Sequence, residues 1–560
     1  MPAHSIGHDG AVSNNPSAAD PRSLVLQGDP YVEHITARLL DFFAEATPWQ
    51  RRLWDTGIVM ALRELDEAAY WSYRHVLSGS AIKYLAGDLQ REAGQDRGVG
   101  NKELRTHLQS VLKSGTPYGS RHHRTLVRLI DLIQTDYIKR WATSFDTASP
   151  PSPERLARAV ASHLLDCGYS MSYLHRWVTG HLGSASTLGE LLDSAAELAI
   201  RPNRSFEVVV PFEAIPQAEQ LAHGLDEWMS AKELSKWLVS YAEGRLVRQS
   251  GGFRYNIQAK DPYSAAGVAE STVDRLRARA SYTRKTGRGH RIPVAAASIW
   301  VRDGATGICL EVSRRDEPNR GAFVLSLQTE RRVYDASRPT ALDDALELAA
   351  PLNNGAPGPA ISGGWAAVEA LLVAPGDVDD SKERGVVATQ RMAALVTCSW
   401  PRAELTALSH RHRPPMPDRL SHDLAATQTN LERAHVVAAA LSSQRYLELS
   451  TESDRAAQQR MIKLLTEPRS TLSDVSRHVT SAMRRLYRQR NLLMHGGSTG
   501  SVALNSTLRT SAPLVGAGLD RLTHAALTNN VAPLDLATRA EVNLKLVGGP
   551  DGPDVVRLLE

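Results

Sequence analysis

The sequence predicts a multidomain, mainly α-helical protein with a central α+β unit and a C-terminal all-helical bundle. Three observations lead to this fold class. The chain has 560 residues, enough for about two to four domains that each bury a core. Apolar residues recur at helical spacing over most of the chain and alternate with polar residues only in its middle. Two segments rich in Pro, Gly, Ser or Asn interrupt these patterns and indicate linkers.

The first part of the chain is predicted to be a tail followed by a helical domain. Residues 1–28 are rich in Ala, Ser, Asn, Pro, Gly and Asp, and we expect them to be disordered. In residues 29–147 apolar side chains recur at helical spacing, for example at Ile35, Leu39 and Phe43. A helical domain is therefore predicted here, followed by a linker that is rich in Pro and Ser.

Residues 153–203 are predicted to be a helical hairpin region. A helix begins behind Pro153, a turn follows at Gly168, and a second helix follows the turn. Two interpretations stay open. The pair is either a helix-turn-helix that reads DNA through His175 and Arg176, or a plain hairpin whose Leu and aromatic side chains pack together.

Residues 204–350 are predicted to form an α+β domain, a small antiparallel sheet with helices on one face. Alternating or β-branched runs indicate strands at 205–211, 252–259, 292–301, 307–313 and 322–328. Helical spacing indicates helices at 231–242 and 262–280. Residues 351–362, rich in Pro, Gly and Asn, are predicted to be a linker. The remaining residues, 363–560, are expected to be an independent helical bundle.

The most informative motif lies near the end of an Arg-rich helical segment. Arg490, Asn491 and His495 fall within about one and a half helical turns, and Gly496-Gly497 then ends the helix. A guanidinium can neutralise a phosphate, an imidazole can transfer a proton near neutral pH, and an amide can hold either group in place. These side chains suit RNA cleavage without a metal.

The spacing alone is not specific, because Arg followed five residues later by His occurs three times. The other two occurrences are Arg158 to His163 and Arg176 to His181. Only the third has Asn directly after Arg, basic residues upstream and a Gly-Gly stop after His. Its context therefore distinguishes it from the other two.

A helical wheel places the motif on the predicted helix from Val475 to His495. One apolar stripe should face the core, and it contains Val475, Val479, Ala482, Met483, Leu486, Leu493 and Met494. Arg484, Arg488, Asn491 and His495 share the opposite face. Arg490 falls at the edge of the stripe, so it must extend towards solvent, pair with a carboxylate or lie at an interface.

This segment resembles the signature of the HEPN superfamily (higher eukaryote and prokaryote nucleotide-binding), whose ribonucleases carry Arg, a polar residue and His at this spacing. The resemblance extends to residues 364–372, which look like the first helix of the family with an acidic residue in an apolar run, and to Leu514–Leu527 as a closing helix. It covers about the last 200 residues.

The resemblance implies a metal-independent endoribonuclease. His495 would act as general base or acid, Arg490 would stabilise charge on the phosphate, and Asn491 would fix the imidazole or contact phosphate. Arg484 and Arg488 would bind the RNA backbone. A homodimer with a composite cleft and products ending in a 2′,3′-cyclic phosphate or 3′-phosphate are also implied.

The resemblance further implies a toxin or anti-phage effector, with the N-terminal region as a sensor and with a regulatory partner or antitoxin that the sequence does not identify. Two alternative functions remain. One is a non-catalytic HEPN-type module that binds nucleotide or RNA. The other is a helix-turn-helix DNA-binding regulator.

Composition limits the other possibilities. The net charge of +4 and a pI near 8.9 are only mildly basic. Three widely spaced cysteines argue against a disulfide framework and for a reducing compartment, so we expect a cytoplasmic protein. No apolar run is long enough to span a bilayer, and the N-terminus lacks the apolar core of a signal peptide. His and carboxylate residues lack metal-site spacing, so we expect no metal or cofactor.

Overall fold

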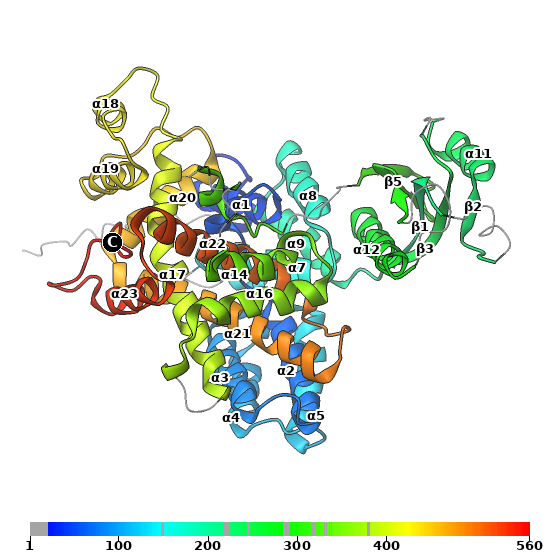
Figure 1. The fold of residues 1–560 in the computed structure, drawn as a ribbon, viewed down its shortest axis with the longest axis horizontal. Coiled ribbons are helices and arrows are strands. Elements are labelled where there is room, and N and C mark those ends of the chain that lie inside the picture. Colours follow the sequence, from blue (N-terminus) through cyan, green and yellow to red (C-terminus); the bar gives the residue numbers. More distant parts are fainter. Residues whose placement is uncertain are drawn as a thin grey trace, which may run out of the picture.

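The protein is mainly helical and carries one small antiparallel sheet, as the sequence predicts. The computed structural model describes residues 21–560 apart from 147–149, 217–223, 244–246, 284–291, 315–319, 330, 332, 335–336, 338 and 378–380. Two parts can be distinguished in Figure 1. A large helical body contains residues from both ends of the chain, and a sheet unit from the middle of the chain lies at one side.

The N-terminal half of the helical body consists of α1 to α9. Their bounds are α1 Pro30–Phe43, α2 Ile58–Tyr73, α3 Gly79–Gln95, α4 Lys102–Ser114, α5 Arg121–Thr135, α6 Tyr137–Thr143, α7 Pro153–Asp166, α8 Met171–Gly183 and α9 Leu188–Ile200. Polar caps begin most of them; Asp29, for example, accepts the backbone N–H groups of Tyr31 and Val32. Their apolar faces share one core. Residues 29–147 are thus mainly helical, and they share their core with α7 to α9.

The described end of the predicted tail is ordered. Residues 1–20 lie outside the described residues, but Pro21–Ser23 forms a short 3₁₀ helix and Val25 pairs with Thr187 in an isolated bridge. Leu26 is buried in the N-terminal core. The prediction of disorder was therefore wrong for residues 21–28, because two leucines in a polar segment are enough to anchor it against α9.

Helices α7 and α8 form the hairpin predicted for residues 153–203. Leu164, Leu174 and Val178 are fully buried in the N-terminal core, as the plain hairpin requires. Arg176, the exposed base-contacting candidate, has its guanidinium 5.1 Å from the ring centroid of Tyr263 in the sheet unit. The packing explains the apolar residues of both helices without DNA.

The sheet unit is built from residues 204–313. Its strands are β1 Arg204–Ala214, β2 Trp228–Ser230, β3 Gly251–Ala259, β4 Val294–Ala295, β5 Ser298–Asp303 and β6 Cys309–Ser313. The strand order is β2-β3-β1-β5-β6, and β4 pairs with β1. All pairs are antiparallel; Val208 of β1, for instance, lies opposite Tyr255 of β3 and Val301 of β5. The predicted antiparallel sheet is confirmed.

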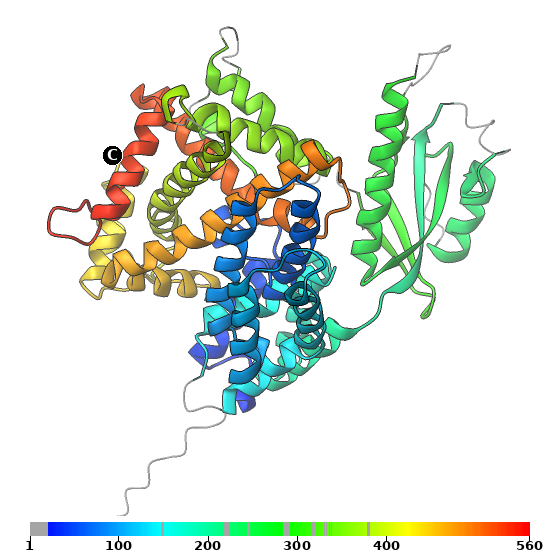
Figure 2. The same cartoon turned by 90° about the horizontal axis from the view of Figure 1, so that it is seen from below.

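Helices cover both faces of this sheet, which corrects the prediction of helices on one face. Figure 2 shows α12 (Pro262–Ser281) between the sheet and the helical body and α11 (Ala231–Tyr241) on the outer side. Alternate residues of β1 therefore enter two cores. Val208 and Val210 pack with α12, whereas Val209 packs with α11. The uninterrupted burial of β1 from Val208 to Phe212 reflects this double cover.

The C-terminal half of the helical body starts earlier than predicted. Its helices are α13 Leu325–Thr329, α14 Ala341–Ala349, α15 Pro351–Asn354, α16 Pro357–Leu372, α17 Ser381–Ser409, α18 Arg419–Ala425, α19 Asn430–Ser442, α20 Glu452–Thr466, α21 Pro468–Gly496, α22 Leu504–Asn529 and α23 Pro533–Leu546. The predicted strand at 322–328 contains α13 instead. The predicted linker 351–362 is helical, because Pro351 and Pro357 occupy first-turn positions that helices tolerate. Leu352 and Ile361 are fully buried.

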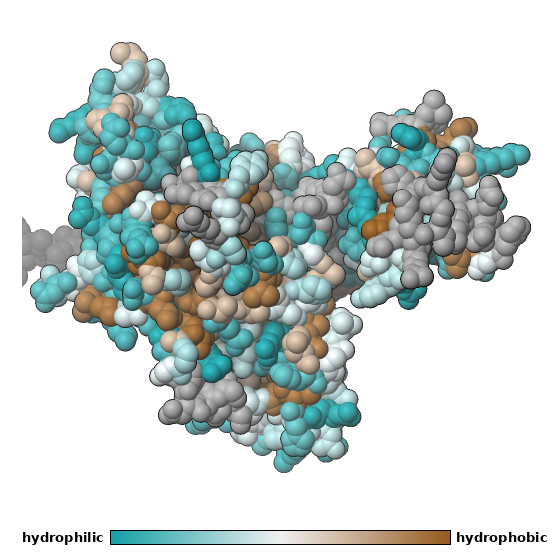
Figure 3. Space-filling model, in the orientation of Figure 1, coloured by the Kyte–Doolittle hydropathy of each residue, from teal (hydrophilic) through white to brown (hydrophobic). Residues whose placement is uncertain are grey.

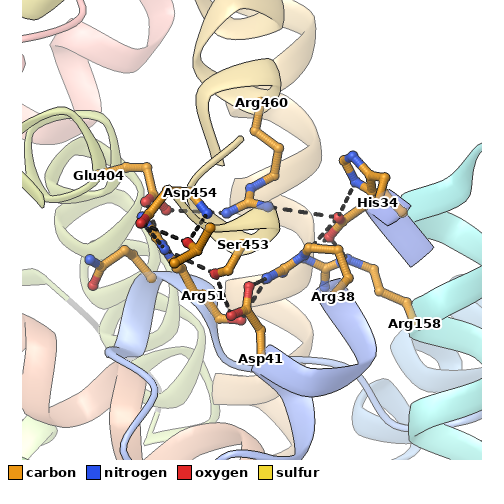
Figure 4. A network of polar contacts seen from close by, with 12 residues as sticks. His34, Arg38, Asp41, Arg51, Arg158, Glu404, Ser453, Asp454 and Arg460 are labelled. Atoms are coloured by element: carbon orange, nitrogen blue, oxygen red, sulfur yellow. Dashed lines mark hydrogen bonds and ion pairs between the residues drawn. The ribbon is translucent and has the colours of Figure 1, made fainter. Parts of the chain in front are cut away.

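Buried ion pairs join the two halves of the helical body. Figure 4 shows this junction, in which Arg51 contacts Glu404 and Asp454 at 2.7 and 2.8 Å. Arg460 reaches both Glu404 and Glu154, at 3.4 and 3.9 Å. The two cores also exchange residues. Trp54 packs among the buried residues of the C-terminal helices, whereas Leu492 packs among those of the N-terminal helices. The predicted independent bundle of residues 363–560 therefore shares its interior with the N-terminal helices.

The surface in Figure 3 is largely hydrophilic over α18 and α19, with hydrophobic side chains interspersed over the central helices. None of the described helices is long and apolar enough to cross a membrane.

Candidate functional site

Helix α21 carries the motif at its C-terminal end. The helix is continuous from Pro468, and Gly497 ends it in the left-handed conformation at φ 63°, with its N–H bonded to the carbonyl of Leu492. The predicted helix and its glycine stop are thus confirmed. The apolar stripe is buried from Val475 to Leu486. Met494, predicted to belong to it, is instead 58 % exposed.

The three motif side chains lie together. Arg490 Nη1 is 3.1 Å from Asn491 Oδ1 and 3.5 Å from His495 Nε2. Because a guanidinium can only donate, the Nε2 atom that faces it is presented as an acceptor. This arrangement places a permanent cation, an amide and a proton-accepting imidazole at one spot.

Arg490, which lies at the edge of the apolar stripe, faces a carboxylate. Its side chain is 28 % exposed, and Nη2 lies 4.0 Å from Oε2 of Glu369 in α16. Glu369 is the acidic residue within the apolar run at 364–372. Helices α16 and α21 pack against each other, so two of the segments on which the resemblance rests, residues 364–372 and the motif, meet in space.

The motif opens into a cleft of about 990 Å³, which we call the motif cleft. Its walls come from α21, from α16 and the start of α17, and from the turn between α2 and α3 together with α3 itself. The lower part of Figure 1 shows these helices side by side. Polar and aromatic side chains that line the motif cleft include His75, Tyr84, Glu369, Arg384, Arg484 and Tyr487.

Arg484, a predicted RNA contact, lines the motif cleft. Its guanidinium lies 4.6 Å from the ring centroid of Tyr84, and Nη1 is 3.4 Å from Asp88. Tyr84 is 45 % exposed. A planar cation next to an exposed aromatic ring offers both a phosphate contact and a stacking surface.

Arg488, the other predicted RNA contact, also lines the motif cleft, but it is buried and its guanidinium is paired with Glu64. It is 4 % exposed, and its Nε and Nη2 donate to Oε1 of Glu64 in α2 at 3.0 and 2.8 Å. Arg485 donates to the other oxygen of Glu64. Burial alone raises the pKa of Glu64, but Arg488 and Arg485 outweigh it and hold the pKa below its usual value. The helical wheel did not predict this burial, because α2 covers a polar face of α21 that the wheel assigns to solvent.

The other two Arg–His spacings do not form comparable sites. Arg158 pairs with Asp55 and Glu154, at 2.7 and 2.8 Å. His163 is buried against the ring of Tyr137 instead. Of the three Arg–His pairs, which all lie within the described residues, Arg490 and His495 are the pair whose side chains are in contact.

Sequence reasoning missed the wall of the motif cleft that comes from the N-terminal helices. His75 and Tyr84 are separated from the motif by about 400 residues, and nothing in their local sequence indicates a site. The prediction would have required knowing that α2 and α3 lie beside α21. Within the described part of the chain, no three His, Cys, Asp or Glu residues are grouped so that they could hold a metal ion.

Comparison with protein-family models, with curated proteins and with solved structures gave no match.

Proposed function

We propose that the protein is a metal-independent endoribonuclease whose active site is the motif cleft. The observation that carries the proposal is the contact of Arg490 with both Asn491 and His495 at the wall of an open cleft. Phosphate neutralisation and proton transfer need these groups within reach of one scissile bond. The resemblance of the motif to HEPN ribonucleases supports the same chemistry.

The reaction is an internal transesterification of RNA. His495 takes the proton of the ribose 2′-hydroxyl or protonates the leaving 5′-oxygen, and Arg490 stabilises the charge that develops on the phosphate. The 2′-oxygen forms a bond to phosphorus while the bond to the 5′-oxygen breaks. The products end in a 2′,3′-cyclic phosphate, which hydrolyses to a 3′-phosphate, and in a 5′-hydroxyl. Asn491 holds the Arg490 guanidinium in position.

RNA is the proposed ligand of the whole cleft. Arg484 and Arg384 line it and supply cations for neighbouring phosphates, and Tyr84 offers its exposed ring to a base. Glu369 opposes this charge, since it lies 4.0 Å from Arg490. We assign to Glu369 the positioning of Arg490 while the cleft is empty of phosphate.

A homodimer, a cytoplasmic location and a role as a toxin or anti-phage effector complete the proposal, and they rest on the resemblance and the composition. The dimer contact would have to leave out the face of α21 that carries Arg485 and Arg488, because Glu64 occupies it. Sedimentation equilibrium measures the oligomeric state directly. The regulatory partner is unidentified.

The decisive experiment is RNA cleavage in EDTA. Purified wild-type protein should degrade RNA in excess chelator, and His495→Ala should not. Arg176→Ala is the matched control, since Arg176 is exposed and does not line the motif cleft. If the wild-type protein retards RNA in a gel without cleaving it, the non-catalytic binding module is the better description. Loss of cleavage on adding EDTA would contradict the metal-free mechanism.

A further inference from the structure

The motif cleft holds a second imidazole that belongs to the same chain. His75 lies in the turn between α2 and α3, is exposed, and lines the cleft together with Arg490, Asn491 and His495. Its ring makes no hydrogen bond or ion pair with any other residue of the described part of the chain. The side chain is thus free to meet a ligand.

The end of α2 is in direct contact with the end of α21. A Cβ atom at Gly496 would lie only 3.0 Å from Cζ3 of Trp71. The carbonyl of Trp71 in turn accepts the backbone N–H of Val76, the residue after His75. In addition, Ser501 donates to Glu67 of α2 at 2.6 Å. These contacts fix the turn that carries His75 against the helix end that carries His495.

The backbone of His75 adopts a conformation that ordinarily selects glycine. His75 has φ 59°, its N–H bonds to the carbonyl of Ser72, and the N–H of Val76 bonds to that of Trp71. This is the Schellman arrangement that ends many helices, in which glycine usually holds the left-handed position. A histidine there is strained relative to an ordinary backbone conformation, and such strain is often found at functional sites. The position retains an imidazole where glycine would be more stable.

The contact between Arg490 and His495 separates the roles of the two imidazoles. Arg490 Nη1 faces Nε2 of His495 at 3.5 Å, so that nitrogen carries the lone pair of the ring, and once a phosphate binds the guanidinium in its place the lone pair can accept a proton as a general base does. Cleavage also needs a group that gives a proton to the leaving 5′-oxygen. Among the described side chains that line the motif cleft, His75 carries the second imidazole, a group that can donate a proton as a general acid.

We propose that His75 is the general acid of the cleavage reaction, an inference that rests on the proposed ribonuclease function. His495 removes the proton from the 2′-hydroxyl, the bond from the 2′-oxygen to phosphorus forms, and the bond to the 5′-oxygen breaks as His75 protonates it. One proton leaves the 2′-hydroxyl and one reaches the 5′-hydroxyl, so the step is balanced. Proton exchange with water restores both rings. One chain then supplies both imidazoles of the site.

The test uses His75→Gly, which removes the imidazole and suits the left-handed backbone. Gln444→Gly is the matched control, because Gln444 has φ 58° in the same arrangement at the end of α19 and does not line the cleft. Both variants should be at least as resistant to thermal unfolding as the wild type. The cleavage position is first mapped with wild-type protein on one RNA. That RNA is then prepared with sulfur in place of the bridging 5′-oxygen, a leaving group that needs no general acid.

His75→Gly should cleave ordinary RNA at least about 100-fold more slowly than wild type and should cleave the sulfur-bridged RNA within about tenfold of it. Gln444→Gly should match wild type on both substrates, and His495→Ala should fail on both. Wild-type cleavage rates for His75→Gly on ordinary RNA would overturn the inference, as would equal losses on both substrates. A wild-type protein that cleaves neither RNA would instead refute the proposed function itself.

Discussion

Glu64 of α2 and Arg488 of α21 form a buried ion pair of 2.8 Å between residues that are 424 positions apart. Arg485 completes the cluster from the same helix. Arg488 lies two residues before Arg490, so the N-terminal helices hold the helix that carries the candidate active site. A sensor in the N-terminal region would act on α21 through contacts of this kind.

Removal of Glu64 should destabilise the helical body strongly. Glu64→Ala leaves Arg485 and Arg488 buried without a partner, and we expect the free energy of unfolding to fall by about 3–5 kcal/mol. Urea denaturation followed by circular dichroism measures the change. Glu197→Ala, at an exposed position within α9, should change it by no more than about 0.5 kcal/mol. Equal stability of both variants would show that the buried cluster contributes little.

Substitutions of Arg490 should show whether cleavage needs only its positive charge or also its planar guanidinium. Arg490→Ala should abolish cleavage, and Arg490→Lys should lose most of it, because lysine keeps the cation but cannot contact Asn491, His495 and a phosphate with one planar group. Single-turnover rates on a labelled RNA measure both losses. Arg176→Ala should keep the wild-type rate. Arg158 is an unsuitable control, because its pairs with Asp55 and Glu154 are structural.

Local sequence signals predicted much of the fold and the centre of the site. The Gly497 stop, the Ser and Asp helix caps and the alternation in residues 252–259 act within a few residues, so α21, most other helices and β3 could be predicted. Helical spacing places Asn491 and His495 on one face, but the contact of Arg490 with both depends on how its long side chain extends. Pro and Gly in residues 351–362 misled the prediction, because Pro351, Pro357 and Pro359 all stand in first helical turns.

Contacts between distant segments could not be predicted in the same way. The burial of Arg488 depends on Glu64, and the far wall of the motif cleft depends on His75 and Tyr84. A helical wheel assumes that a polar face meets water, and no local pattern reveals that another helix covers it. The left-handed His75 also gives no sequence signal, since glycine is the residue that marks such turns.

The sheet unit should fold alone, and the C-terminal bundle should not. All residues of the two cores of the sheet unit lie between 206 and 312, so a fragment of residues 204–314 keeps its whole interior. Residues 357–560 would lose Arg51, Glu64 and Asp166, the partners of Glu404, Arg488 and Arg509. Denaturation of each fragment tests this. We expect a cooperative transition for the first and aggregation or a gradual transition for the second. A cooperative, monomeric second fragment would restore the independent bundle.

His163 should make the helical body less stable in mild acid. Its side chain is buried against Tyr137, and burial, together with Arg63 and Lys260, lowers its pKa to about 3. In the unfolded chain the pKa returns to about 6.5, so below that pH the unfolded state binds a proton that the folded state does not. Stability is therefore lost as the pH falls from about 6.5 towards 3. The loss from this group at pH 4.5 is about 3 kcal/mol relative to pH 7.5.

Replacement of His163 by leucine isolates this contribution, because leucine fills an apolar site and does not titrate. Urea denaturation at pH 7.5 and 4.5 should show a difference between the two pH values that is about 3 kcal/mol smaller for His163→Leu than for wild type. His122→Ala removes an exposed histidine of α5 and should keep the full wild-type difference. Carboxylates also titrate in this range, so the test is the comparison between variants rather than the wild-type value alone. If the difference in stability between the two pH values is the same in His163→Leu as in wild type, His163 is protonated inside the folded protein.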